Sequence, residues 1–131
     1  MFKYDFLSEH NFQSKEDMTH SVCKFISDEY GIELNDILIK INERERIGSV
    51  EVDKNFFLPH IEYSGDLQGL VLVNYKMNKE KYTSLFMIVN VTKVNEQLER
   101  FLMTCLNGQG MNELRNCNSQ KEFEKIIREM S

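Results

Sequence analysis

The stretch Ile47-Gly-Ser-Val-Glu-Val-Asp-Lys-Asn-Phe-Phe-Leu-Pro-His60 is the part of the sequence from which the fold and the chemistry are both inferred. It alternates through Val50 and Val52, becomes continuously apolar, and stops at Pro59-His60, which contains the only proline of the chain. Proline has no N–H for a strand ladder, so the pattern predicts a strand that ends at Pro59. We therefore expect His60 at the rim of a sheet, on backbone held stiff by the preceding proline. That position suits a reactive imidazole.

A charged helix is predicted immediately before this stretch. It begins at about Asn35 or Asp36, directs Leu38 and Ile41 inward, and ends at Gly48. Its last turn is Glu43-Arg-Glu-Arg46. Cations near a helix C-terminus interact favourably with the helix dipole, so a solvated helix end would also account for both arginines.

Composition and charge exclude several classes of protein. The chain has 131 residues, enough for one domain with a real core, and we expect a single domain over 1–131. Its 16 basic and 21 acidic residues give a net charge of −5, which disfavours direct nucleic-acid binding. No apolar run approaches the roughly 20 residues needed to span a bilayer, and the N-terminus shows no signal peptide. Three scattered cysteines are typical of reduced thiols, so we expect a cytoplasmic protein.

The remaining pattern predicts an α/β fold. The apolar run at 85–91 is typical of a central strand covered on both faces. Because helical patterns precede and follow the strands, a sheet with helices on both faces is the simplest arrangement. The other predicted elements are a strand or arm within 1–12, a helix from the Ser14 cap to Gly31, a strand at 69–75, a charged connection at 76–81, helices near 98–106 and 111–115, and a last helix capped by Ser119 and Glu122.

The segment from Glu43 to His60 resembles the active-site stretch of the fructose/mannitol-type (type 2) EIIA domains of the bacterial phosphotransferase system. That family's pattern is roughly E-R-E-x-x-G-S-T-x-x-x-x-G-I-A-I-P-H. The matching positions here are Glu43-Arg44-Glu45, Gly48-Ser49 and Pro59-His60. A weaker resemblance runs from about Phe6 to Met130 and implies a mixed sheet flanked by helices. It also implies that His60 accepts a phosphoryl group from the carrier protein HPr.

The residues of this stretch suit phosphoryl transfer. That reaction needs positioning and charge stabilisation more than covalent chemistry by the protein. The acceptor must be a neutral imidazole with one nitrogen free, and an acceptor group should hold the other ring N–H. Arg44 matches the family's arginine, and its planar fork suits phosphate oxygens. Our candidate catalytic residues are therefore His60 as phosphoacceptor, supported by Arg44 and by Gln97.

Gln97 enters the candidate site as a departure from the family. The family often has a second histidine in an E-H-L sequence, where this chain has Glu96-Gln97-Leu98. Glutamine can donate a hydrogen bond to a phosphoryl oxygen but cannot carry charge or shuttle a proton. Val50, Asn55 and Phe57 replace the family's threonine, glycine and alanine, and the segment at 76–83 is abbreviated. These departures argue against efficient onward transfer to an EIIB domain.

Three functions follow from the resemblance. The preferred one is a sugar-responsive regulatory domain of a transcriptional regulator or antiterminator, phosphorylated by HPr and acting on a neighbouring regulatory domain. The alternatives are a sugar-transport phosphocarrier that passes the phosphate to EIIB, and a degenerate interaction domain without phosphorylation. No cofactor is implied, and His10, His20, His60 and the cysteines lack metal-ligand spacing. Cys105 is expected in the core, and His10 and His20 on the surface.

Overall fold

The computed structural model describes residues 1–8 and 11–130, so the predicted surface position of His10 lies outside the described residues. None of the described helices is long and apolar enough to cross a bilayer. In chain order the elements are β1 (Phe2–Leu7), α1 (Lys15–Tyr30), α2 (Leu34–Ile47), β2 (Glu51–Asp53), β3 (Phe56–Phe57), β4 (His60–Glu62), β5 (Gln68–Met77), β6 (Glu80–Val89), α3 (Glu96–Cys105), α4 (Gly108–Arg115) and α5 (Gln120–Met130).

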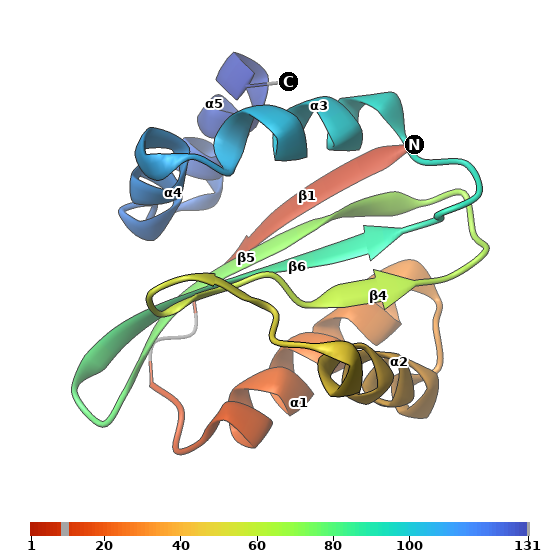
Figure 1. The fold of residues 1–131 in the computed structure, drawn as a ribbon, viewed down its shortest axis with the longest axis horizontal. Coiled ribbons are helices and arrows are strands. Elements are labelled where there is room, and N and C mark those ends of the chain that lie inside the picture. The colour runs from red at the N-terminus through yellow and green to blue at the C-terminus, as the bar shows by residue number, and fades with distance from the viewer. Residues whose placement is uncertain (9–10, 131) are drawn as a thin grey trace.

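The strands form one mixed sheet in the order β1-β5-β6-β3-β2, and β4 also pairs with β6 (Figure 1). The long strands β5 and β6 are antiparallel, whereas β1 runs parallel to β5, and both β3 and β4 run parallel to β6. The expected mixed sheet flanked by helices is therefore confirmed.

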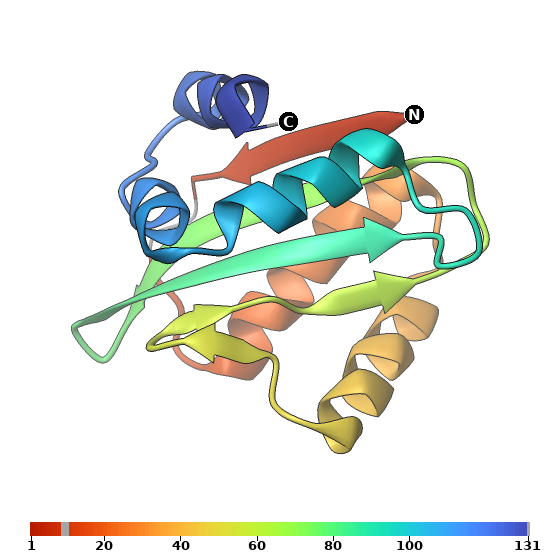
Figure 2. The ribbon, with the colours of Figure 1, turned by 45° about the horizontal axis from the view of Figure 1, so that its top comes forward.

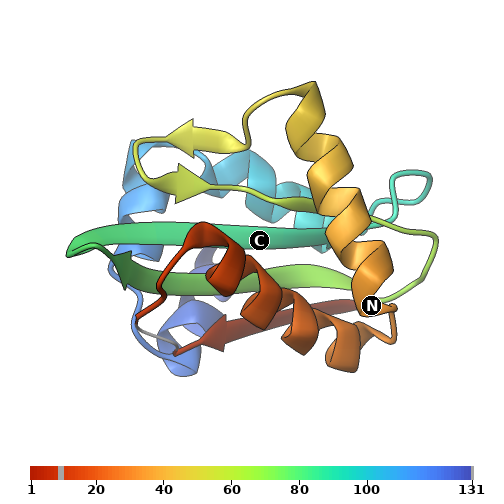
Figure 3. The ribbon, with the colours of Figure 1, turned by 90° about the horizontal axis from the view of Figure 1, so that it is seen from below.

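Helices cover both faces of this sheet. Helices α1 and α2 lie on one face (Figure 3), and α3, α4 and α5 lie on the other (Figure 2). Successive residues of β5 and β6 point to opposite faces, so Val71 packs with the α1–α2 side and Leu70 with the α3–α5 side. The prediction of a central strand covered on both faces is confirmed for β6, whose Leu85, Phe86 and Ile88 are fully buried.

Local capping explains where the helices begin and end. The Asp17 N–H donates to Ser14 Oγ over 3.1 Å, and α1 ends at Gly31 in the left-handed conformation at φ 66°. The Glu122 N–H donates to Ser119 Oγ over 3.1 Å and starts α5 in the same way. The helix predicted before Gly48 is α2. These predictions are confirmed. The features could be predicted because each depends on contacts within a few residues.

The prediction of one strand ending at Pro59 is wrong. The stretch forms two short antiparallel strands, β2 and β3, and the chain reverses at Asn55, which has φ 57°. Asparagine tolerates this left-handed conformation, and its N–H donates to Glu51 Oε2 over 2.9 Å. Pro59 then joins β3 to β4. Its carbonyl accepts from the Met87 N–H of β6 over 2.9 Å.

The charged connection predicted at 76–81 is also wrong, because most of it is strand. Strand β5 continues to Met77, β6 begins at Glu80, and a two-residue turn joins them. Its central residues, Asn78 and Lys79, have φ values of 52° and 70°. Positive φ at both positions gives a two-residue turn whose twist matches that of the flanking strands. Lysine is an unusual residue in that conformation, so the sequence carried little signal for this turn.

We expect Gly69→Ala to destabilise the fold by about 1–3 kcal/mol through overpacking. A Cβ at Gly69 would meet the Lys3 carbonyl oxygen of the neighbouring strand β1 and the Tyr30 hydroxyl. Gly48→Ala is the matched control, since a Cβ there meets nothing and its backbone is extended. Urea unfolding of both variants is the measurement, and a Gly69→Ala midpoint equal to that of Gly48→Ala would contradict the close β1–β5 approach.

Candidate functional site

His60 is the first residue of β4 and is half-buried. It pairs in register with Met87 of β6, and the next residue, Ile61, is buried against the α1–α2 layer. Because side chains alternate along a strand, His60 and Glu62 lie on the other side of β4 from Ile61. Helix α2 packs alongside β4 (Figure 3), and residues of both elements line one cavity that includes His60.

Arg44 lies in the last turn of α2 and contacts His60 directly. Its Nε–H donates to His60 Nδ1 over 3.2 Å. Its Nη1 donates to the Gly48 carbonyl over 3.4 Å at the end of the same helix. The guanidinium is thus held between a helix C-terminus, which favours a positive charge, and the imidazole. The structure brings these two sequence-predicted residues together.

The hydrogen bond defines the protonation state of the His60 ring. Arginine has only donors, so Nδ1 must accept with its lone pair, and the proton of the neutral ring lies on Nε2. The sequence suggested that an acceptor would hold the ring N–H. Instead a donor occupies the ring's free nitrogen, because the group that α2 places beside the imidazole is a guanidinium.

Two effects keep His60 neutral. Burial lowers the pKa of the imidazole, and the nearby charge of Arg44 lowers it further. The carboxylate of Glu62 acts in the opposite direction. Since the ordinary pKa of histidine is about 6.5, the net lowering leaves the ring uncharged at neutral pH. A neutral imidazole is the form that can act as a nucleophile.

A small cavity of about 180 Å³ opens beside the imidazole. This volume is smaller than that of a typical metabolite pocket but leaves room for a phosphoryl group. Lys40 precedes Arg44 by one helical turn on α2, so its side chain lies on the same helix face. The cavity is lined by Lys40, Glu43, Arg44, Ile47, His60 and Glu62.

Sequence reasoning missed Lys40 and Glu62 as parts of this cavity. The signals were present but weak: Lys40 is spaced i, i+4 from Arg44, and Glu62 is spaced i, i+2 from His60. Gln97 lies in the first turn of α3 and is half-buried, with its backbone N–H donating to Asn95 Oδ1 over 2.9 Å. It is not among the described residues that line the His60 cavity.

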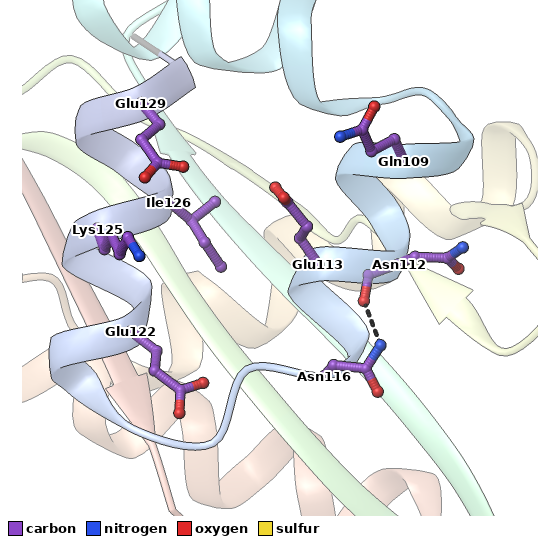
Figure 4. A pocket seen from close by; sticks show the side chains of 8 residues that line it. All are labelled: Gln109, Asn112, Glu113, Asn116, Glu122, Lys125, Ile126 and Glu129. Carbon is purple, nitrogen blue, oxygen red and sulfur yellow. Dashed lines mark hydrogen bonds between the residues drawn. The ribbon is translucent and has the colours of Figure 1, made fainter.

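A larger cavity of about 610 Å³ lies elsewhere, in the groove between α4 and α5 (Figure 4). Three carboxylates line it, and those of Glu113 and Glu129 point into the space between the two helices. Lys125 is the one cation among its described lining residues. Such a negative wall repels a phosphoryl group, and its lining has no histidine, so the chemistry points to the smaller cavity.

The cysteines are poor nucleophiles. Cys23 and Cys105 are fully buried, and burial raises the pKa of each thiol to about 12. The reactive thiolate is therefore scarce at neutral pH. Cys105 packs in the core, as its sequence pattern predicted, and His20 is exposed on α1.

Comparison with known proteins gives a match in structure and none in sequence. No protein-family model matches the chain, and no curated protein sequence does. A solved structure, the nitrogen regulatory protein IIA-Ntr from Neisseria meningitidis, matches with a TM-score of 0.67. The match covers 94% of this chain and 92% of that one, at 17% sequence identity. This chain has the fold of a IIA-Ntr protein. The expected EIIA-type fold is thereby confirmed, while the fructose/mannitol type remains a prediction.

The lowered pKa of His60 predicts how stability depends on pH. The unfolded chain binds this proton more readily than the folded protein, so the folded state loses stability as the pH falls below about 6.5. We expect His60→Gln to lose less stability than the wild type between about pH 7.5 and about pH 5.5. Urea unfolding at both values tests this, with His20→Gln on the exposed face of α1 as control. Equal losses in wild type and His60→Gln would contradict the buried, Arg44-contacted ring.

Proposed function

We propose that this chain is a cytoplasmic EIIA-like domain in which His60 accepts a phosphoryl group from an HPr-type phosphocarrier. The observation that carries the proposal is the contact of Arg44 Nε with His60 Nδ1, both of which line the cavity. It pairs a neutral nucleophile with a guanidinium suited to phosphate oxygens. The name of the structural neighbour, a nitrogen regulatory protein, supports a regulatory role over a transport role.

The proposed transfer needs no external base. The lone pair of one His60 ring nitrogen forms an N–P bond as the N–P bond of the donor's phosphohistidine breaks. The donor imidazole leaves with that electron pair. The proton on the other His60 ring nitrogen stays in place, so the product is a phosphorylated imidazolium. The protein's task is to present the neutral ring and to stabilise the phosphoryl oxygens.

Arg44 has to release Nδ1 during this reaction, whichever nitrogen attacks. If Nδ1 attacks, its lone pair must be free. If Nε2 attacks, the ring must first change tautomer by proton exchange with water, and Nδ1, which then carries the proton, cannot accept from Arg44. In both cases the freed Nε–H can donate to a phosphoryl oxygen. We propose that Arg44 holds the resting ring and moves onto the phosphoryl group as it arrives.

Lys40 is proposed as the second cation of the site. A phosphoryl group carries about −1.5 to −2 charges at neutral pH, more than one guanidinium balances. Lys40 lines the same cavity, and among the described residues it has no ion-pair partner. Its ammonium could therefore turn to the phosphoryl oxygens. Gln97 remains the sequence-based candidate for a further hydrogen bond.

The regulatory proposal follows from the charges of the site. A carrier must release its phosphoryl group as readily as it accepts it, whereas a sensor needs only a slowly reversed change in charge. Two cations favour retention, and Gln97 cannot adjust its own charge. We therefore propose that phosphorylation reports to a neighbouring regulatory domain, as in a sugar-responsive transcriptional regulator or antiterminator. Transfer to an EIIB domain in sugar transport is the second candidate function.

We expect incubation with phosphoenolpyruvate, enzyme I and HPr to add one acid-labile phosphate to the wild-type protein. Replacement of the nucleophile in His60→Ala should abolish labelling, and His20→Ala on the exposed face of α1 should label normally. Labelled phosphate counted after gel filtration at neutral pH is the measurement. Labelling of His60→Ala at the wild-type level would refute the assignment.

The phosphorylated protein from the same experiment separates regulation from transport. With unphosphorylated HPr added, we expect the label to return to HPr. With an isolated EIIB domain added, we expect the label to stay on His60. Rapid and saturable transfer to EIIB would establish the carrier function instead.

We expect Arg44→Ala to slow phosphorylation of His60 by about 10²–10³, the usual cost of removing a donor to a transition state. Lys40→Ala should slow it by about 10-fold, because it removes one charge-assisted contact. Lys24→Ala is the matched control, since Lys24 is exposed on α1 and is not among the described residues that line the cavity. Initial rates at fixed phospho-HPr give the comparison. Gln97→Ala, measured alongside, tests the remaining sequence-based candidate. A phosphorylation rate equal to that of the control would mean that Gln97 does not contact the phosphoryl group.

A further inference from the structure

A second polar site lies near the turn of the β5–β6 hairpin, and we name it the hairpin trough. It consists of two adjoining cavities of about 540 Å³ and about 240 Å³ that share Lys81, Arg115 and Asn116. Four cations from four different parts of the chain meet there. They are Lys54 between β2 and β3, Lys76 in β5, Lys81 in β6 and Arg115 at the end of α4.

The register of the hairpin builds this site. On the face covered by α4, three successive cross-strand pairs are Leu72–Leu85, Asn74–Thr83 and Lys76–Lys81. The pairs thus change from apolar to polar to cationic towards the turn of the hairpin. This turn extends past the other strands at the end of the sheet where α4 lies (Figure 1). In the middle pair, Asn74 Nδ2 donates to the Leu114 and Cys117 carbonyls over 2.9 and 2.8 Å. These bonds hold the end of α4 over the hairpin.

The lysines of the trough are poorly balanced by carboxylates. Lys76 and Lys81 face each other directly, and like charges opposite one another destabilise an antiparallel pair. Among the described residues, no carboxylate forms an ion pair with Lys54, Lys76 or Lys81. The trough therefore concentrates positive charge in a chain whose net charge is −5.

The nearby acidic groups are engaged elsewhere. Asp53 pairs with Arg115, whose Nη2 lies 2.7 Å from Asp53 Oδ2. Glu51 accepts from the Asn55 N–H over 2.9 Å. Glu80 accepts from the Tyr82 hydroxyl over 3.2 Å, and alternation along β6 puts it on the opposite face from Lys81. Among the described residues, none of these carboxylates forms an ion pair with the three lysines, so the lysines keep charge that an anionic ligand can balance.

The end of α4 does not account for these lysines. A helix C-terminus attracts cations because its last carbonyls lack partners. Here the Leu114 carbonyl already accepts from Asn74, and the Asn112 carbonyl accepts from the Asn116 side chain over 2.9 Å. Arg115 in the last turn supplies the cation that the helix dipole favours.

We propose that the hairpin trough binds a small organic phosphate, at a site separate from His60. Lysine ammonium groups are point charges suited to phosphate oxygens, and the combined space is that of a metabolite pocket. The side chains of Asn116 and Asn118 offer hydrogen-bonding groups for the polar remainder of such a ligand. Lys81 and Met87, the residue paired with His60, are six residues apart along β6, about 20 Å of strand. The trough is therefore a second site and not an extension of the first.

Titration of the ¹⁵N-labelled full chain with inorganic pyrophosphate tests the proposal. We expect saturable shifts of the backbone amides of Lys81, Thr83, Arg115 and Asn116, and weakening by added salt because screening reduces charge–charge attraction. The Lys76→Gln/Lys81→Gln double variant should bind at least about 10-fold more weakly. The matched control is Lys24→Gln, a lysine on the exposed face of α1. Thermal unfolding checks the variant itself, which should melt no lower than the wild type because a like-charge pair is removed.

Three outcomes would overturn the proposal. The first is the absence of saturable shifts at the trough amides. The second is wild-type affinity in a double variant that is shown to be folded. The third is tighter binding of a polyglutamate peptide than of pyrophosphate or ATP at the same amides, which would mean that an acidic protein segment is the natural partner. Shifts confined to the amides of Arg44 and His60 would be an instance of the first outcome.

Discussion

Burial of the β5–β6 pair on both faces is the constraint on which the rest of the structure depends. A strand pair with apolar side chains on one face needs one covering layer, but here Leu70 and Leu72 face one way while Val71 and Val73 face the other. Each of these side chains is fully buried. Helices must therefore lie on both sides, which puts α1 and α2 against one face and α3 to α5 against the other.

The position of the His60 site follows from this layering. Strand β4 adds to β6 in parallel and lies beside α2, so the last turn of a helix that is needed for burial also delivers Arg44 to the imidazole. The same packing partly removes His60 from water and lowers its pKa. One arrangement thus supplies the neutral imidazole and the cation that the proposed phosphoryl transfer requires.

The charges of the surface are arranged locally and are not described by the net charge. The groove between α4 and α5 is lined with carboxylates, while the hairpin trough on the other side of α4 is lined with cations, and both include Asn116. Because charge interactions are screened over about 10 Å in salt, the local charge of a surface matters more to a ligand than the net charge of the chain. A net charge of −5 is therefore compatible with the two separate phosphate sites that we propose.

The sequence by itself determined the features that depend on near neighbours. The capped starts of α1 and α5, the end of α2 before Gly48, the two-sided burial of β6 and the candidacy of His60 and Arg44 were all predictable. They rest on hydrogen bonds within a turn, on periodicity, or on a short motif. The tight turn at Asn78-Lys79 and the reversal at Asn55 were not predictable, because both depend on strand pairing that overrides weak local preferences.

Only the tertiary structure decided which side chains meet. Lys40 joins His60 because α2 crosses beside β4, and Gln97, which the motif suggested, lies on α3 and does not line the described cavity. Lys54, Lys76, Lys81 and Arg115 are scattered over sixty residues of sequence and converge because hairpin register and helix docking bring them together. Such contacts join residues distant in sequence, and their geometry follows from packing that no local pattern encodes.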